Sequence, residues 1–318
     1  MGAHEFHTPH LGSRNAVTPE SKKRGLMSTP TNPRREHPST YFVQDRSSEE
    51  EITRLLIQDQ MITAGMGGVL PEQPDPAIFQ RMLDVGCGPG GWLIEAARTY
   101  PSMNLLVGVD VSSRMVECAR AQAIAQQVSD RVEFHTMDAL RMLEFPSDSF
   151  DLVNQRAGGS YLRTWDLPKL LSEFQRITRK GGVIRLTEAN IIESTSPALT
   201  RHSYLLFQAF CQAGHFFTKD WKGLTSELAH LLQKSGLQNV QTRSFTLEYR
   251  GGTAEGQRFA EDMRRFFRTI APFLRRWSWV PEDYQDLCQQ ALHEMQQPDF
   301  VATWGMLTAW GRVPLRKR

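Results

Sequence analysis

One stretch of nine residues, Leu83-Asp84-Val85-Gly86-Cys87-Gly88-Pro89-Gly90-Gly91, constrains the fold of this chain more than any other. The apolar run at 81–85 predicts a short buried strand, and the glycines let the backbone turn where a Cβ atom would clash. From 92 to 98 the apolar spacing becomes helical. The order strand, glycine loop, helix presents bare N–H groups and the positive end of a helix to a polar or anionic ligand.

The loop fits two ligand-binding patterns. The first is the dinucleotide pattern G-x-G-x-x-G, formed by Gly86, Gly88 and Gly91, with Asp110 where a ribose-binding acid is expected. The second is D-x-G-x-G-x-G, which begins at Asp84 and ends at Gly90. A carboxylate at the strand end would repel a pyrophosphate but attract a ligand that carries ammonium and sulfonium groups. Asp84 therefore favours the second pattern, and motifs elsewhere in the chain are needed to distinguish the two.

Length and composition limit the class of protein. A chain of 318 residues suffices for one large domain with additions, and 40% hydrophobic with 23% charged residues is typical of a globular protein. The formal net charge of +2 predicts no strong attraction to nucleic acid or an anionic membrane. The four cysteines form no C-x-x-C pair, which favours a reducing compartment and no zinc site. Neither an apolar run of membrane-spanning length nor a signal peptide is evident, so we expect a cytoplasmic protein.

The N-terminal part divides in two. Residues 1–38 are rich in Pro, Ser, Thr, His and basic residues, so we expect a disordered tail, partly vector-derived. Such sequence explains the evenly spaced His4, His7 and His10 better than a metal site does, and we predict no metal. Residues 39–76 are expected to form a helical lid and linker, with a capping box at Ser48 and Glu51. Whether that helix packs plainly or closes over a ligand stays open.

Strands and helices then alternate. We predict strands at 81–85, 104–110, 131–135, 150–154 and 183–187, with helices at 91–100, from the cap at Ser112/Ser113 to 127, and at 167–178. Such alternation implies right-handed crossovers and a parallel sheet covered on both faces, with the core spanning 77–190. Residues 191–318 are predicted to hold helices at 199–214, 224–235, 256–273 and 281–296, and strands at 240–249 and 300–313. The predicted fold is an α/β, Rossmann-like doubly wound sheet of seven strands. It is mostly parallel, with an antiparallel last strand and a helical cap inserted before it.

Several motifs occur in a fixed order along this pattern. After the glycine loop come Gly108-Val109-Asp110-Val111-Ser112 with Met115, then Met137-Asp138-Ala139, then Phe150-Asp151-Leu152-Val153, then Arg179-Lys180-Gly181-Gly182. Taken together they resemble the class I S-adenosylmethionine-dependent methyltransferases, particularly the small-molecule branch of the ubiquinone/menaquinone-biosynthesis type. A dehydrogenase would share the first two motifs and has no reason to carry the third.

The resemblance implies S-adenosyl-L-methionine as cofactor and S-adenosyl-L-homocysteine as product. It assigns cofactor contacts to Asp84, Gly86, Cys87, Gly88, Gly90, Asp110, Val111, Met115, Met137, Asp138, Ala139, Asn154 and Gln155. Asp110 would accept both ribose hydroxyls, a geometry that suits a carboxylate. Asp138 would accept from the adenine amine. The alternative for Asp110, a plain helix cap, is weaker once every motif is present.

The acceptor side is less defined. If the acceptor must lose a proton, candidate bases are Glu188, His202 and His215, near the predicted ligand-binding ends of the strands. Arg156, Tyr161 and Tyr204 are candidates for gripping the acceptor. Capping, surface or structural pairing roles remain open for all of them. The expected reaction is an in-line methyl transfer, in which the protein chiefly aligns the reacting groups.

The helical cap narrows the acceptor class. Its many Phe, Leu and Trp residues suit a small apolar or aromatic molecule methylated on O, N or C. The runner-up is an RNA or other nucleic-acid methyltransferase, for which Arg264, Arg265, Arg268, Arg275, Arg276 and the C-terminal Arg316-Lys317-Arg318 would form a basic stripe. An NAD(P)-dependent oxidoreductase and a non-catalytic cofactor-binding scaffold are further alternatives. Homodimer formation is left open.

Overall fold

The first half of the chain builds the parallel part of one sheet. Its elements are β1 (Arg81–Val85), α2 (Gly91–Thr99), β2 (Leu105–Asp110), α3 (Ser113–Ala125), β3 (Val132–Thr136), β4 (Phe150–Arg156), α4 (Leu167–Ile177) and β5 (Thr178–Ala189). The strands pair in the order β3-β2-β1-β4-β5, and all these pairs are parallel. The chain order reverses between β1 and β4, so the carboxyl ends of these strands form the crevice where ligands bind in open α/β sheets.

The second half closes the sheet and adds a cap. Its elements are β6 (Glu193–Ser194), α5 (Pro197–Ala213), α6 (Leu228–Lys234), β7 (Gln238–Arg250), α7 (Ala254–Trp277), α8 (Tyr284–Glu294) and β8 (Val301–Arg312). β8 is antiparallel to both β5 and β7. Helices α7 and α8 lie between β7 and β8 in sequence, so the predicted cap insertion and the antiparallel last strand are confirmed.

The predicted strand number was wrong. The described part of the chain contains a sheet of eight strands, not seven. The additional strand is β6, whose two residues pair with Ala302 and Thr303 of β8. The register of β5 on β8 begins only at Met306, so β6 extends the edge of β8 that β5 leaves uncovered. A two-residue strand has no periodicity of its own and exists only through this long-range pairing.

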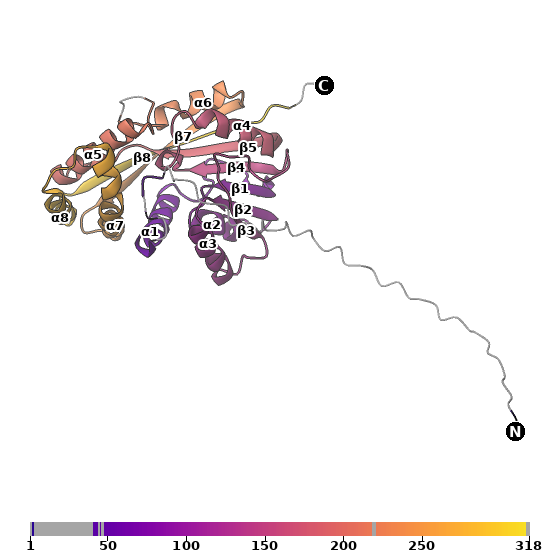
Figure 1. The fold of residues 1–318 in the computed structure, drawn as a ribbon, viewed down its shortest axis with the longest axis horizontal. Helices are drawn as coiled ribbons and strands as arrows, with labels where there is room; N and C mark the ends of the chain where they lie inside the picture. The colour runs from indigo at the N-terminus through magenta and orange to yellow at the C-terminus, as the bar shows by residue number, and fades with distance from the viewer. Residues whose placement is uncertain (1, 3–40, 44, 46–47, 218–220, 316–318) are drawn as a thin grey trace. The chain divides into compact units, whose positions relative to one another are not determined.

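Helices cover both faces of the sheet, as Figure 1 shows. On one face α2 and α3 pack on side chains that include Met82 of β1 and Leu106 of β2. On the other face α4 and α6 pack on the alternate side chains, among them Leu83 and Val85. The alternation of side chains along each strand therefore separates two apolar cores.

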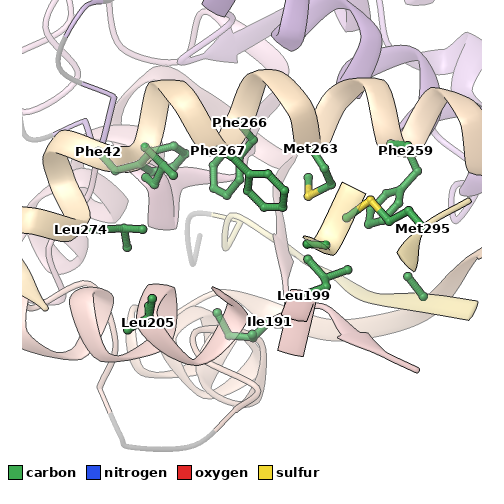
Figure 2. Packing of buried hydrophobic residues seen from close by; sticks show 14 of the residues in the cluster. Phe42, Ile191, Leu199, Leu205, Phe259, Met263, Phe266, Phe267, Leu274 and Met295 are labelled. Atoms are coloured by element: carbon green, nitrogen blue, oxygen red, sulfur yellow. The ribbon is translucent and has the colours of Figure 1, made fainter. Parts of the chain in front are cut away.

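A third apolar core lies in the cap. Helix α1 (Glu49–Gly65) joins α5, α7 and α8 there, over the C-terminal part of β7 and the N-terminal part of β8. The apolar stripe of α7 is buried: Phe259, Met263, Phe266, Phe267 and Ile270. Figure 2 shows these aromatic side chains beneath α7, facing Leu199 and Leu205 of α5. Each fully buried Phe stabilises the fold by roughly 1.5–3 kcal/mol through transfer of apolar area from water.

The computed structural model describes residue 2 and residues 41–43, 45, 48–217 and 221–315. The predicted tail at 1–38, with its three histidines, lies outside the described residues except for Gly2, as does Arg316-Lys317-Arg318. The described residues from 41 to 315 belong to one compact unit. Within the described ranges, no helix combines the length and the apolar character needed to cross a bilayer.

Candidate functional site

The glycine loop has the conformation that its sequence predicts. Gly86, Gly88 and Gly90 have φ values of +72°, +53° and +82°, a region that side-chain-bearing residues rarely adopt. A Cβ atom on Gly86 would lie 2.7 Å from the Tyr161 hydroxyl, and one on Gly90 would lie 2.6 Å from the Phe134 ring. The backbone amides of Gly86 and Cys87 donate to the Val109 carbonyl at 2.8 and 3.0 Å. The loop is therefore anchored to β2, and the space around it excludes larger residues.

Asp110 links this loop to the next helix. One carboxylate oxygen accepts from the Gly88 amide at 3.0 Å, and the other accepts from the Ser112 amide at 2.9 Å. The side chain of Ser112, not that of Asp110, is the N-cap of α3 and accepts from the Met115 amide. A carboxylate offers about four acceptor positions. Asp110 therefore positions the loop and keeps the chemical capacity to accept ligand hydroxyls.

Asp84 lies at the crevice with only 4% of its surface exposed. Its Oδ1 accepts from Asn154 Nδ2 at 2.7 Å. No hydrogen bond from a described residue reaches its Oδ2. Burial raises the pKa of Asp84 to about 6, although the charge of Arg156 and the bond from Asn154 oppose the rise. A bound cation beside Oδ2 would favour the ionised form further.

The third motif lies beside the second. The Met137 amide donates to the Asp110 carbonyl at 2.9 Å, which brings the ends of β2 and β3 together. Asp138 accepts from the Leu140 amide at 2.9 Å and lies 3.5 Å from the Arg141 guanidinium. The remaining residues predicted for the adenine, Val111, Met115 and Ala139, lie on the segments that follow these two strands. The predicted cofactor residues thus belong to neighbouring strand ends.

Two residues predicted for the acceptor lie beside the glycine loop. Arg156 is ion-paired with Asp59 of α1, and its guanidinium lies 5.7 Å from the centre of the Trp92 ring. The Tyr161 hydroxyl lies 3.4 Å from the Val85 carbonyl, next to Gly86. Arg156 therefore links α1 to the end of β4 beside the glycine loop, and Tyr161 forms a wall of the crevice.

A cavity of about 150 Å³ opens next to the ends of β4 and β5. Its walls come mainly from α1, α5, α7 and the segments that follow β4 and β5. The lining residues are Tyr41, Phe42, Arg54, Leu55, Gln58, Ala157, Gly159, Ser160, Glu188, Ala189, Asn190, Ile191, Ile192, Leu199, His202, Ser203, Leu206, Phe210, Phe216, Leu224, Met263, Phe266 and Trp304. Most of these side chains are apolar or aromatic, which is typical of a small-molecule pocket.

Glu188 is the carboxylate of this cavity. Both of its oxygens lie 3.2 Å from the Gly159 amide, and Gln155 Nε2 lies 3.4 Å from Oε1. Burial raises the pKa of Glu188 to about 7, although these hydrogen bonds favour the charged form. A carboxylate that titrates near neutrality can both accept and release a proton at physiological pH.

The two histidines have different surroundings. His202 lines the cavity, and its Nε2 lies 3.2 Å from the Tyr284 hydroxyl. Because that hydroxyl donates to the Phe267 carbonyl, we assign the proton of the imidazole to Nε2. Burial lowers the pKa of His202 to about 3, so the ring is neutral. His215 lies outside the cavity, donates from Nδ1 to the Leu162 carbonyl at 2.8 Å, and has a pKa lowered to about 4, mainly by burial.

Tyr204 also lies outside the cavity, with 52% of its surface exposed. It follows His202 by two positions on α5, so its side chain leaves the helix on a different side. Conversely, the cavity includes Arg54 and Gln58 of α1, which were absent from our sequence-based candidates. The helix begins where it was predicted, but the predicted capping box was wrong, because Ser48 makes no side-chain cap bond and Glu51 pairs with Arg54. The weak amphipathic pattern of the helix did not identify which side faces the pocket.

Comparisons with known proteins agree with this geometry. Residues 82–182 match a family model described as a methyltransferase domain. Residues 82–182 therefore form a methyltransferase domain, and the chain is an S-adenosylmethionine-dependent methyltransferase. A demethylmenaquinone methyltransferase of Bacillus cereus (strain ATCC 10987 / NRS 248) is 27% identical over 182 residues, covering 52% of this chain and 73% of the relative.

A solved structure shares the fold of this methyltransferase. The phosphoethanolamine N-methyltransferase 2 of Haemonchus contortus, in complex with phosphomonomethylethanolamine and S-adenosylhomocysteine, has a TM-score of 0.52 at 19% identity. The alignment covers 86% of this chain and 60% of that one, so the chain spans about three fifths of its length. The cofactor of the methyltransferase is S-adenosylmethionine. The glycine conformations, the open Asp84 oxygen and the acceptor capacity of Asp110 fit that molecule.

Proposed function

We propose that this chain transfers the methyl group of S-adenosylmethionine to an uncharged, largely apolar small molecule bound in the cavity. The observation that carries this proposal is the composition of the cavity wall, which combines aliphatic and aromatic side chains with one titratable carboxylate, Glu188. A cavity of about 150 Å³ is of the size that holds one aromatic ring. The predicted cofactor residues keep their proposed role at the adjoining strand ends.

The charges around the cavity argue against an anionic acceptor. Arg54 is the cation among the described lining residues, and it is already paired. Its Nε and Nη2 donate to Glu51 at 2.8 and 2.7 Å, and its Nη1 lies 3.5 Å from Asp262. A phosphate or carboxylate would have to be desolvated without a cation to compensate it. The demethylmenaquinone for which the Bacillus relative is named suits such a wall better than a phosphate does.

Glu188 would act as the proton acceptor. The bound cofactor supplies an electrophilic methyl group, so the protein has to align the acceptor and receive any proton that it releases. Glu188 in its ionised form takes that proton, while the Gly159 amide keeps the carboxylate in place. His202, neutral and fixed by Tyr284, would orient a polar group of the acceptor from the opposite wall. His215 and Tyr204 have no role in this proposal, and Arg156 and Tyr161 act at the cofactor side.

We also propose that nucleic acid is not the acceptor and that the enzyme acts in the cytoplasm. Three of the arginines of α7 lie in ion pairs: Arg264 and Arg265 with Glu261, and Arg268 with Glu50. These pairs reduce the positive charge available for phosphates. The four cysteines are free thiols, as is usual in a reducing compartment.

The proposal can be tested with phenol and phenyl phosphate as matched probes that each carry one aromatic ring. We expect phenol to bind the enzyme–S-adenosylhomocysteine complex, measured by calorimetric titration, and phenyl phosphate to bind at least about tenfold more weakly. Leu206→Trp places a bulkier side chain in the cavity wall, so it should abolish phenol binding and leave cofactor affinity unchanged. Preferential binding of the phosphate, or no binding of phenol, would contradict the proposed acceptor class.

A further inference from the structure

Four buried polar side chains form a continuous chain beneath the crevice. Asp84, Asn154 and Arg185 are register partners on the adjacent strands β1, β4 and β5. Arg185 Nη1 donates to Asn154 Oδ1 at 2.8 Å, and Asn154 Nδ2 donates to Asp84 Oδ1 at 2.7 Å. At the other end Arg185 donates to Glu72 from Nε at 2.8 Å and from Nη2 at 3.2 Å. We call Glu72, Arg185, Asn154 and Asp84 the polar row.

The polar row has a fixed direction. An arginine has donors but no acceptor, so the oxygen of the Asn154 amide must face Arg185. The amide nitrogen then faces Asp84, and Asp84 Oδ1 can only accept. A proton on Asp84 therefore cannot reside on Oδ1. The charge of Arg185 acts on Asp84 through the fixed orientation of the Asn154 amide.

The Arg185–Glu72 ion pair of the polar row lies at an unusual place for an ion pair with a purely structural role. The side chains of Arg185 and Glu72 are 1% and 0% exposed, and Asn154 is also fully buried. A buried ion pair is weak evidence for stability, because desolvation can exceed the Coulombic gain and apolar replacements are often neutral or stabilising. The face that holds the row is otherwise an apolar core packed under α2. The role of the pair is therefore to be sought in what it orients.

We propose that Glu72, Arg185 and Asn154 are positioning residues that keep Asp84 as a carboxylate with its Oδ2 directed at the cationic part of S-adenosylmethionine. This inference rests on the proposed place of the cofactor at Asp84. It extends the site to Glu72, in the segment between α1 and β1, and to Arg185, on a strand that carries no predicted cofactor contact.

The charges around Asp84 agree with this role. Arg156 of β4 and Asp59 of α1 face it, together with Arg185 of β5, and Cys87 and Tyr161 are the other titratable neighbours. The carboxylates of Asp84, Asp59, Glu72 and Asp110 outnumber the guanidinium groups of Arg156 and Arg185, which leaves an excess of negative charge. S-adenosylmethionine, with a carboxylate, an ammonium and a sulfonium, carries one net positive charge. The excess of negative charge therefore favours its binding.

The nearly isosteric substitution Asn154→Asp tests the direction of the row. The new carboxylate would pair with Arg185 and repel Asp84, so Asp84 would bind its proton up to higher pH. In calorimetric titrations with S-adenosylmethionine and no acceptor, we expect wild-type affinity to rise between pH 5.5 and pH 7.5 and then level off. The variant should bind at least about tenfold more weakly at pH 7 and recover part of the loss by pH 9. Asn104→Asp, an exposed substitution of the same kind at the other end of the sheet, should follow the wild-type profile.

Comparison of two variants distinguishes a failure of this inference from a failure of the proposed cofactor site. If Asp84→Asn binds S-adenosylmethionine like the wild type, the proposed site is wrong. If Asp84→Asn weakens binding while Asn154→Asp changes affinity equally at every pH, the site stands and the polar row is only structural. Should Asn154→Asp fail to fold, Asn154→Ser removes the amide without adding charge, and it should shift the rise in affinity to higher pH. A Ser variant with the wild-type pH profile would overturn the inference.

Discussion

Replacing Glu188 with glutamine should make the protein more stable at alkaline pH. Glu188 is 6% exposed, and burial raises its pKa to about 7 from the ordinary 4.5. The folded protein therefore holds this proton more tightly than the unfolded chain does, and the free energy of unfolding falls as pH rises from about 4.5 to 7. The penalty is fully present above pH 7. Glutamine keeps an oxygen that accepts from the Gly159 amide and carries no charge at any pH.

The size of the effect follows from the difference in pKa. One pKa unit corresponds to about 1.4 kcal/mol, so the wild type should lose roughly 2–3 kcal/mol between pH 5 and pH 8.5 through Glu188 alone. Asp84 and Asp262, whose pKa values burial also raises, are present in both proteins and cancel in the comparison. We therefore expect the stability of Glu188→Gln relative to wild type to increase by roughly 2–3 kcal/mol over this range.

Urea denaturation at the two pH values measures this difference directly. The midpoints and slopes of both proteins give the free energy of unfolding without any acceptor or cofactor. Glu133→Gln, a substitution of an exposed glutamate of β3, serves as a matched control and should show no such pH dependence. A stability difference between Glu188→Gln and wild type that is the same at both pH values would refute the raised pKa and remove the basis for Glu188 as a base.

Three further predictions concern packing and the surface. Phe259→Ala should lower the free energy of unfolding by roughly 3–5 kcal/mol, because the ring is fully buried under α7, whereas the exposed Arg258→Ala should change it by less than about 0.5 kcal/mol; similar urea midpoints would contradict the cap core. Gly86→Ala should destabilise the protein and weaken cofactor binding, since φ is +72° and Tyr161 blocks the Cβ position; calorimetry with unchanged affinity would argue against a tight loop. Filter binding of RNA should show weak affinity without a steep salt dependence. An affinity whose salt dependence corresponds to the release of several ions would favour the nucleic-acid alternative.

Much of the architecture was predictable from local signals. The glycine loop set the end of β1 and the start of α2, and apolar runs located β2 to β5, although β5 begins five residues earlier than predicted. Capping residues such as Ser112 fixed helix starts. These features depend on a few consecutive residues, so the sequence specifies them without knowledge of the rest of the fold.

The parts that escaped prediction depend on contacts between distant residues. Asn154 lies 70 residues from Asp84 and 31 from Arg185, and Glu72 lies 113 from Arg185. No spacing rule joins such positions. Tyr204 is a different case, because the apolar face of α5 could have shown that it leaves the helix away from His202.

The central claim is that carboxylates at neighbouring strand ends hold the cofactor. The most direct measurement is a calorimetric titration of S-adenosylmethionine into wild type, Asp110→Asn and Asp130→Asn. Asp130 is exposed and precedes β3, at the opposite end of the strands. We predict that wild type and Asp130→Asn bind with equal affinity and that Asp110→Asn binds at least about tenfold more weakly. Equal binding by all three proteins would contradict the account.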